Sequence, residues 1–255
     1  MISHVRIPSA LFITGLAAAL PGTAFAEDGK TGEEGFYVAV KGGVTSPSDE
    51  DFDGIQAPQG ASPGVPGAPA VVDLEFDEDF TFAGTVGYRF DKRVFGIFQP
   101  SIEAEYSYAS PDISGGSFNG GDQSFSGDLD INTFTINYRS DIRWSETQRV
   151  IPYTSGGIGV ADVDAQVAYF PNNGVANAPT FALSGGDTGF VLHNTIGLSF
   201  RLTDQIDLET SARYQRISGI DLERRFIGDG GNDFSADVGG RYETVSGFAG
   251  IRFRF

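Results

Sequence analysis

A short acidic segment carries the side chains best suited to chemistry. Asp49, Asp51 and Asp53 alternate along the chain and Gly54 follows them, which matches the first half of a calcium-binding loop. In such a loop the alternate carboxylates converge on a hard cation, and the glycine permits a sharp turn. The twelfth position is Gly60, so the bidentate glutamate of a complete loop is missing. The pattern therefore leaves two interpretations: a site for a divalent cation such as Ca²⁺, or a solvated acidic loop.

Other motifs that would indicate an enzyme are absent from the sequence. It has no G-x-S-x-G elbow, no P-loop, no H-E-x-x-H motif and no cysteine. Those motifs would supply a nucleophile, a phosphate-binding loop or metal ligands. We therefore predict no catalytic residues, and no cofactor apart from a cation at the acidic segment.

Residues 1–26 have the features of a secretory signal peptide. Arg6 provides the positive region, residues 11–20 the apolar region, and residues 24–26 a small-x-small cleavage site. An apolar run of about ten residues is too short to cross a bilayer as a helix. We expect cleavage after Ala26, which would export residues 27–255 as one domain.

The composition of the 255-residue chain excludes several classes of protein. Its formal net charge of -17 is the opposite of what binding to phosphates requires, so we expect no nucleic-acid partner. The absence of cysteine excludes a disulfide framework. A polytopic helical membrane protein would need repeated apolar runs of about 20 residues, and the chain lacks them. The 22 phenylalanines and 9 tyrosines argue against disorder.

Apolar and polar residues alternate in eight segments of the exported chain, and we find no convincing helical period. In the first segment Phe36, Val38 and Val40 share one face, whereas Lys41 lies on the other. Such alternation predicts β-strands. The eight predicted strands are residues 36–41, 80–90, 101–108, 132–139, 151–160, 190–201, 206–214 and 245–255.

The connections between the predicted strands alternate in length. The long connections lie at about residues 46–75, 109–130, 161–188 and 216–243, and the short ones at 91–98, 140–149 and 202–205. An even number of strands, with long loops at one end and short turns at the other, is typical of a bacterial outer-membrane barrel. A ten-stranded barrel is the main structural alternative, because residues 165–170 and 180–184 could form an additional hairpin.

The period of two does not by itself distinguish a membrane barrel from a soluble sandwich or a lipocalin-like barrel. Three observations favour the membrane barrel: the export signal, the many charges on the polar faces, and a chain that ends on the alternating residues Ile251, Phe253 and Phe255. In a membrane barrel the apolar faces meet lipid and the polar faces line the interior. We predict an all-β fold, an eight-stranded antiparallel up-and-down transmembrane β-barrel, in the cell outer membrane.

The predicted strands resemble those of the OmpA transmembrane-barrel, opacity-protein and surface-antigen group. The residues that carry this resemblance are 36–43, 135–139, 152–157, 197–203 and 250–255. The resemblance covers the strands and not the long loops, and it supports the architecture better than any activity. It implies that Ile251, Phe253 and Phe255 form a C-terminal signal for the barrel-insertion machinery. It also implies an interior ion-pair network, because Lys41 and Glu103 occupy places similar to a lysine and a glutamate of that network.

Eight strands enclose a lumen that side chains can fill, and charges inside it must be paired. The candidate lumen network comprises Lys41, Glu103, Glu105, Arg139, Glu209, Arg213 and Arg252. We expect Lys41 to pair with Glu103 or Glu105, and Glu209 with Arg213 or one of the C-terminal arginines. The predicted function is structural and surface-presenting, with acidic external loops that could be adhesive or bind ions. The alternative is a narrow channel for ions or small solutes. The expected partners are outer-membrane lipid, lipopolysaccharide, the insertion machinery and an external ligand or host surface.

One segment allows a remote enzymatic alternative. His193-Asn194-Thr195 resembles the His-x-Ser element of lipid A deacylases, which are also small outer-membrane barrels. Those enzymes use serine where this chain has threonine, and their groups face lipid, whereas His193 lies on the predicted lumen face. We therefore expect His193 to be a hydrogen-bonded lumen residue.

Overall fold

The computed structural model describes residues 34–58, 65–171, 178–227 and 234–255. The described chain forms one antiparallel all-β barrel. No helix in these ranges is long and apolar enough to cross a membrane. The predicted signal peptide lies outside the described residues.

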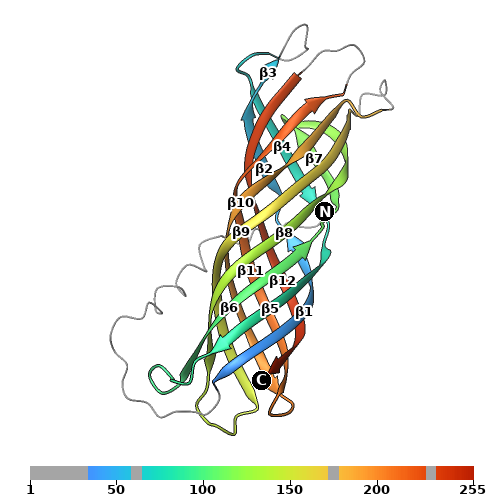
Figure 1. The fold of residues 1–255 in the computed structure, drawn as a ribbon. Coiled ribbons are helices and arrows are strands. Elements are labelled where there is room, and N and C mark those ends of the chain that lie inside the picture. Colours follow the sequence, from blue (N-terminus) through green and yellow to red (C-terminus); the bar gives the residue numbers. More distant parts are fainter. Residues whose placement is uncertain (1–33, 59–64, 172–177, 228–233) are drawn as a thin grey trace.

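Eight strands form a closed ring at the end of the barrel that carries the C-terminus (Figure 1). The ring closes because the first strand pairs with the last, with Val40 opposite Ile251. Its members, in order around the ring, are β1 (Gly35–Pro47), β5 (Asp79–Arg89), β6 (Phe98–Ala109), β8 (Gly121–Ile142), β9 (Val150–Pro171), β10 (Phe181–Arg201), β11 (Ile206–Phe226) and β12 (Phe234–Arg254). The eight-stranded prediction is confirmed. Of the residues that suggested an additional hairpin, 165–170 belong to the outer part of β9 and 181–184 to the outer part of β10. We call this part of the barrel the membrane ring.

A second ring of eight continues the barrel beyond the first. In this outer ring β2 (Glu50–Ile55), β4 (Pro69–Phe76) and β7 (Ile113–Phe118) take the places of β1, β5 and β6, while the other five strands run through both rings. The outer ring closes where β2 pairs with β12 and where β7 turns back onto β8. The two-residue strand β3 (Ala57–Pro58) also pairs with β12. Figure 1 shows the resulting tall cylinder, with β2, β3, β4 and β7 at the end opposite the C-terminus.

The predicted long loops are therefore largely strands. Residues 113–118, 161–171 and 216–226, for example, are extended and paired where loops were expected. β8 and β9 are each 22 residues long, whereas about 9–11 residues suffice to cross the membrane. Roughly half of each long strand must therefore stand outside the bilayer.

The outward faces of the membrane ring form an apolar belt. Its large side chains are exposed because lipid, rather than protein, covers them in the membrane. Phe134 and Ile136 on β8 are typical, with 59% and 60% of their surface exposed. The other members of the belt include Phe36, Val40, Phe80, Phe82, Val86, Ile102, Ile158, Val160, Phe190, Ile196, Leu208, Val245, Ile251 and Phe253.

The polarity of the two faces reverses in the outer ring. On β8, Leu129 and Ile131 point inward in phase with Thr133 and Thr135, but they are apolar, and the outward neighbour Asp130 is charged. Side chains of this kind pack the outer interior as a dry core: Phe52, Ala70, Val72, Leu74, Ile113, Phe125, Leu129, Ile131, Ala161, Val163, Ala165, Val167, Tyr169, Leu183, Val191, Ile217, Ile220, Leu222, Ala236, Val238 and Tyr242. The outer ring thus has the pattern of a water-soluble barrel, in which apolar side chains turn away from solvent.

Candidate functional site

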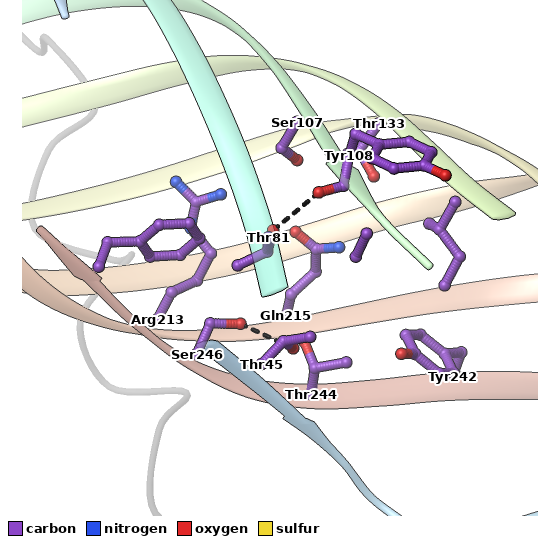
Figure 2. A pocket seen from close by; sticks show the side chains of 13 residues that line it. Thr45, Thr81, Ser107, Tyr108, Thr133, Arg213, Gln215, Tyr242, Thr244 and Ser246 are labelled. Atoms are coloured by element: carbon purple, nitrogen blue, oxygen red, sulfur yellow. Dashed lines mark hydrogen bonds between the residues drawn. The ribbon is translucent and has the colours of Figure 1, made fainter. Parts of the chain in front are cut away.

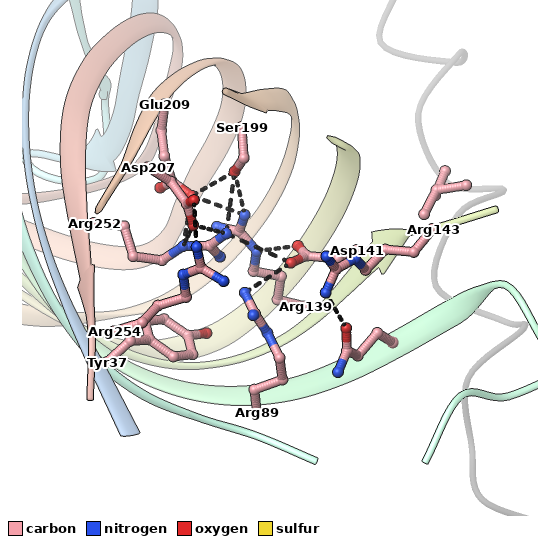
Figure 3. Close-up of polar contacts among 12 residues, drawn as sticks. Tyr37, Arg89, Arg139, Asp141, Arg143, Ser199, Asp207, Glu209, Arg252 and Arg254 are labelled. Atoms are coloured by element: carbon pink, nitrogen blue, oxygen red, sulfur yellow. Dashed lines mark hydrogen bonds and ion pairs between the residues drawn. The ribbon is translucent and has the colours of Figure 1, made fainter. Parts of the chain in front are cut away.

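The lumen of the membrane ring holds a network of buried charges, and Asp141 lies at its centre. The Asp141 carboxylate is 2.7 Å from Arg139 Nε, 3.1 Å from Arg89 Nη2 and 3.6 Å from Arg252 Nη2. Figure 3 shows these arginines converging on it from three different strands. All four side chains are essentially inaccessible to solvent. Because a buried charge is costly unless it is paired, each of these groups depends on the others.

Glu209 and Asp207 continue the network toward β11 and β12. Glu209 Oε1 lies 2.8 Å from Arg139 Nη2 and 3.4 Å from Arg252 Nε, and the Ser199 hydroxyl donates to it at 2.8 Å. Asp207 Oδ2 accepts from Arg252 Nη2 at 2.8 Å. Arginine suits such sites because its planar guanidinium group carries several N–H donors and can therefore bind two carboxylates at once.

A second group of contacts surrounds Glu103 and Glu105, which lie farther along the lumen toward the outer ring. The Glu105 carboxylate forms ion pairs with Arg213 Nη2 at 2.6 Å and Lys41 Nζ at 3.4 Å, and it accepts a hydrogen bond of 3.0 Å from the Thr85 hydroxyl. Glu103 accepts a hydrogen bond of 2.7 Å from the Tyr37 hydroxyl. Arg139 Nη1, 3.7 Å from Glu103, links the two groups.

All seven residues proposed for the lumen network lie in the lumen. Lys41 contacts Glu105, one of its two expected partners, and Glu209 contacts the C-terminal Arg252. Arg213 contacts Glu105 instead of Glu209. The central residue, Asp141, was not among the seven because it lies in the range read as a short turn. The sequence does contain a signal for it: Asp141 follows Arg139 by two residues, and side chains two residues apart on a strand point to the same face.

His193 is buried in the lumen, where its Nε2 lies 2.9 Å from the Asn137 Oδ1 atom. Gly157 on the neighbouring strand makes room for this pair, because a Cβ atom there would collide with both side chains. The structure therefore places His193 away from lipid and next to an amide.

A zone of hydroxyl groups separates the charged network from the apolar outer core. It surrounds a cavity of about 20 Å³, which is the size of roughly one water molecule. Figure 2 shows two of its hydrogen bonds, from Thr81 to the Tyr108 carbonyl (3.0 Å) and from Ser246 to Thr45 (3.0 Å). Other polar side chains of the lining are Ser107, Thr133, Arg213, Gln215, Tyr242 and Thr244.

An arginine among aromatic rings occupies the outer end of the dry core. The Arg224 guanidinium carbon lies 3.4 Å from the ring centre of Phe118 and 4.1 Å from that of Phe181, and Nε donates to the Tyr169 hydroxyl at 2.8 Å. Such cation–π contacts help to stabilise a buried positive charge. Burial lowers the pKa of Arg224 and raises the pKa of Tyr169. Buried side chains of the described residues thus follow one another from the end that carries the C-terminus to this aromatic cluster.

The acidic segment does not form the turn that a calcium loop requires. Asp51 and Asp53 lie on the regular strand β2, on either side of the inward-pointing Phe52, and Asp49 precedes the strand. Carboxylates two residues apart on a strand are separated by about 7 Å along the chain, so they point outward in parallel instead of converging. Within the described ranges no group of three or more acidic, histidine or cysteine side chains is arranged to hold a metal ion.

The C-terminal residues lie on the outside of the barrel. Ile251 and Phe253 belong to the apolar belt, and Phe255 is exposed just beyond β12. The backbone N–H of Phe255 donates to the Phe36 carbonyl at 3.0 Å, which joins the chain end to β1.

Comparisons with known proteins agree with this architecture. Residues 10–250 match the family model described as the outer membrane protein beta-barrel domain, and the chain belongs to this family. It is therefore a β-barrel protein that is located in the cell outer membrane. No curated protein matches the sequence.

Several solved outer-membrane proteins have a similar fold. The match to the outer membrane protease OmpT of Escherichia coli has a TM-score of 0.52 at 7% identity, and covers 86% of this chain and 97% of that one. For OprG of Pseudomonas aeruginosa the TM-score is 0.48 at 17% identity, with 89% and 99% covered. For Neisserial surface protein A the values are 0.45 and 15%, with 86% and 97% covered. At these identities the likeness concerns the fold alone.

Proposed function

We propose that the protein is a closed structural barrel that anchors a rigid column in the outer membrane and presents its outer end to the surroundings. The observation that carries this proposal is the packed interior. A paired ionic network, a hydroxyl zone with room for about one water, and a dry apolar core follow one another along the axis. Within the described residues these three zones of different chemistry lie in series along the axis, which supports a barrel that is closed to water and ions.

The geometry of the outer ring supports a presenting role. Five strands continue without a break from the lipid belt into the outer ring, and the paired strands β2, β4 and β7 complete it. A paired and packed column holds its end at a fixed distance from the membrane, as an adhesive or ligand-contacting surface requires. The proposed partners are an external ligand or host surface at this end.

The exposed C-terminal side chains support a role in assembly. Ile251, Phe253 and Phe255 point outward on an edge that the insertion machinery could bind before the barrel closes on β1. We do not propose an enzymatic function. His193, the one histidine that the structure describes, contacts an amide in a buried position rather than lipid or solvent.

Conductance measurements distinguish the closed barrel from the narrow channel. We expect the refolded protein to show no discrete current steps in planar lipid bilayers, because breaking the network would expose several unpaired charges. Insertion is checked by recovering the protein from vesicles of the same lipid and confirming its heat-modifiable gel mobility. Reproducible steps that change in size when Lys41 is replaced by methionine would show that the lumen conducts and would refute the proposal.

A further inference from the structure

Positive charge on the outer ring is confined to one side of the barrel. The described part of the outer ring contains four basic residues, Arg216, Arg224, Arg225 and Arg241, all on β11 and β12. Arg224 points inward, so three remain on the outside. Elsewhere the outer wall is acidic. Asp130 and Asp164, for example, lie directly opposite each other on β8 and β9.

Two of these arginines lie just beyond the apolar belt. Val245, the last belt residue on β12, is paired with Tyr214, and the next outward-facing pair is Arg216 with Glu243. Arg241 lies one further step out, opposite Ser218. At about 3.4 Å per residue the two arginines stand roughly 7 and 14 Å above the Tyr214–Val245 level along the strands. On β11 and β12 the two arginines thus follow directly on the apolar belt, at the boundary where the hydrocarbon core of a membrane would give way to polar headgroups.

The two guanidinium groups are held in place but still face outward. Arg216 Nε is 3.7 Å and Arg241 Nε 3.3 Å from Glu243 Oε1, and Arg241 Nε is also 3.5 Å from Glu50 Oε2. The Tyr214 hydroxyl fixes Glu243 with a hydrogen bond of 2.8 Å. The arginine side chains remain 43% and 54% exposed, whereas the two glutamates are nearly covered. The carboxylates thus orient the arginines, and the guanidinium groups remain accessible from outside.

The charge balance of this cluster favours an anionic ligand. Burial, together with the nearby Glu243 carboxylate, raises the pKa of Glu50 to about 7. Near neutral pH the two arginines are therefore opposed by less than two full negative charges. We call Arg216 and Arg241, with the glutamates that hold them, the membrane-edge arginine pair.

We infer that the membrane-edge arginine pair binds the phosphate groups of lipid A, the membrane anchor of lipopolysaccharide. Guanidinium groups bind phosphate through paired, charge-assisted hydrogen bonds. The ligand must lie in the outer leaflet, because the pair stands at the upper edge of a lipid-covered surface. The acidic wall on β8 and β9 would repel the same phosphates, so one lipid should be oriented on the β11–β12 side. Lipid binding at this site is independent of whether the lumen is closed.

Native mass spectrometry of the detergent-solubilised full chain tests this site. We expect the wild-type protein to retain bisphosphorylated lipid A, and to bind dephosphorylated lipid A with the same acyl chains at least about tenfold more weakly. The double variant Arg216→Gln, Arg241→Gln should lose binding of the phosphorylated lipid by a similar factor. The matched control is Arg225→Gln, since Arg225 also faces outward on β11 but lies farther from the membrane. Its binding should be unchanged.

Heat-modifiable gel mobility shows whether each variant is folded, and the comparison of the two lipids needs no variant at all. Equal retention of the phosphorylated and dephosphorylated lipids by the wild-type protein would overturn the inference. It would also be overturned if the folded double variant bound phosphorylated lipid A as tightly as the Arg225→Gln control.

Discussion

Replacing Asp141 with asparagine should lower the free energy of unfolding by about 3–5 kcal/mol, which is the usual cost of removing one partner from a buried ion pair. Asp141 offsets the charges of Arg89, Arg139 and Arg252 in a position that solvent does not reach. Asparagine has nearly the same shape, so the effect isolates the lost charge. Urea unfolding of the protein refolded into lipid vesicles, followed by circular dichroism and gel mobility, measures it.

The matched control is Asp204→Asn in the turn between β10 and β11. Asp204 is exposed, and neutralising an exposed carboxylate changes stability by about 0.5 kcal/mol or less. If the Asp141 and Asp204 variants unfolded at the same urea concentration, the buried network would not be a determinant of stability.

Replacing Val163 with aspartate should disrupt the outer ring while leaving the membrane ring closed. Val163 is fully buried in the dry core, on the face of β9 that points inward. An unpaired carboxylate in apolar surroundings costs several kcal/mol, and the outer ring can open locally because proteins unfold in cooperative parts. We expect rapid proteolysis within the outer strands of the variant, together with an unchanged heat-modifiable shift from the protected membrane ring.

The control for this experiment is Gln166→Asp on the same strand. Gln166 is exposed on the outer wall, so a charge there remains solvated and the outer ring should resist protease as in the wild type. A Val163→Asp protein that is equally resistant would mean that the outer interior is hydrated rather than dry.

The membrane ring could be predicted from sequence because lipid and a charged lumen impose a strong contrast on alternate residues. Residues 132–139 illustrate this, since Phe134 and Ile136 alternate with Thr133, Thr135 and other polar residues. The outer ring was missed although its segments also alternate. Residues 128–131 read Asp-Leu-Asp-Ile, a sound strand pattern whose phase is reversed relative to the membrane. The polar and apolar faces of such a segment are the reverse of those of a membrane-spanning strand, and many glycines and aspartates surround it. The segment therefore resembles a loop.

Much of the lumen network could be predicted from sequence, but not every pairing. The strand face of a charged residue follows from its phase, so Lys41, Glu105 and Arg213 could all be assigned to the lumen. Which residues meet across the lumen depends on the tilt and stagger of strands on opposite sides of the barrel. Those quantities place Arg213 against Glu105, and neither the tilt nor the stagger is encoded in the local alternation of one strand.

The reversal of polarity along the barrel is tested most directly by spin-labelling single cysteines on β8, since the chain contains no cysteine of its own. The labelled positions are Asp130, Asn132, Phe134 and Ile136, all on the outward face, and the protein is reconstituted in lipid vesicles. We predict that labels at Phe134 and Ile136 collide mainly with oxygen, which concentrates in lipid, and that labels at Asp130 and Asn132 collide mainly with a water-soluble nickel chelate. Lipid-like accessibility at Asp130 and Asn132, or water-like accessibility at Phe134, would contradict the division into a membrane ring and a solvated outer ring.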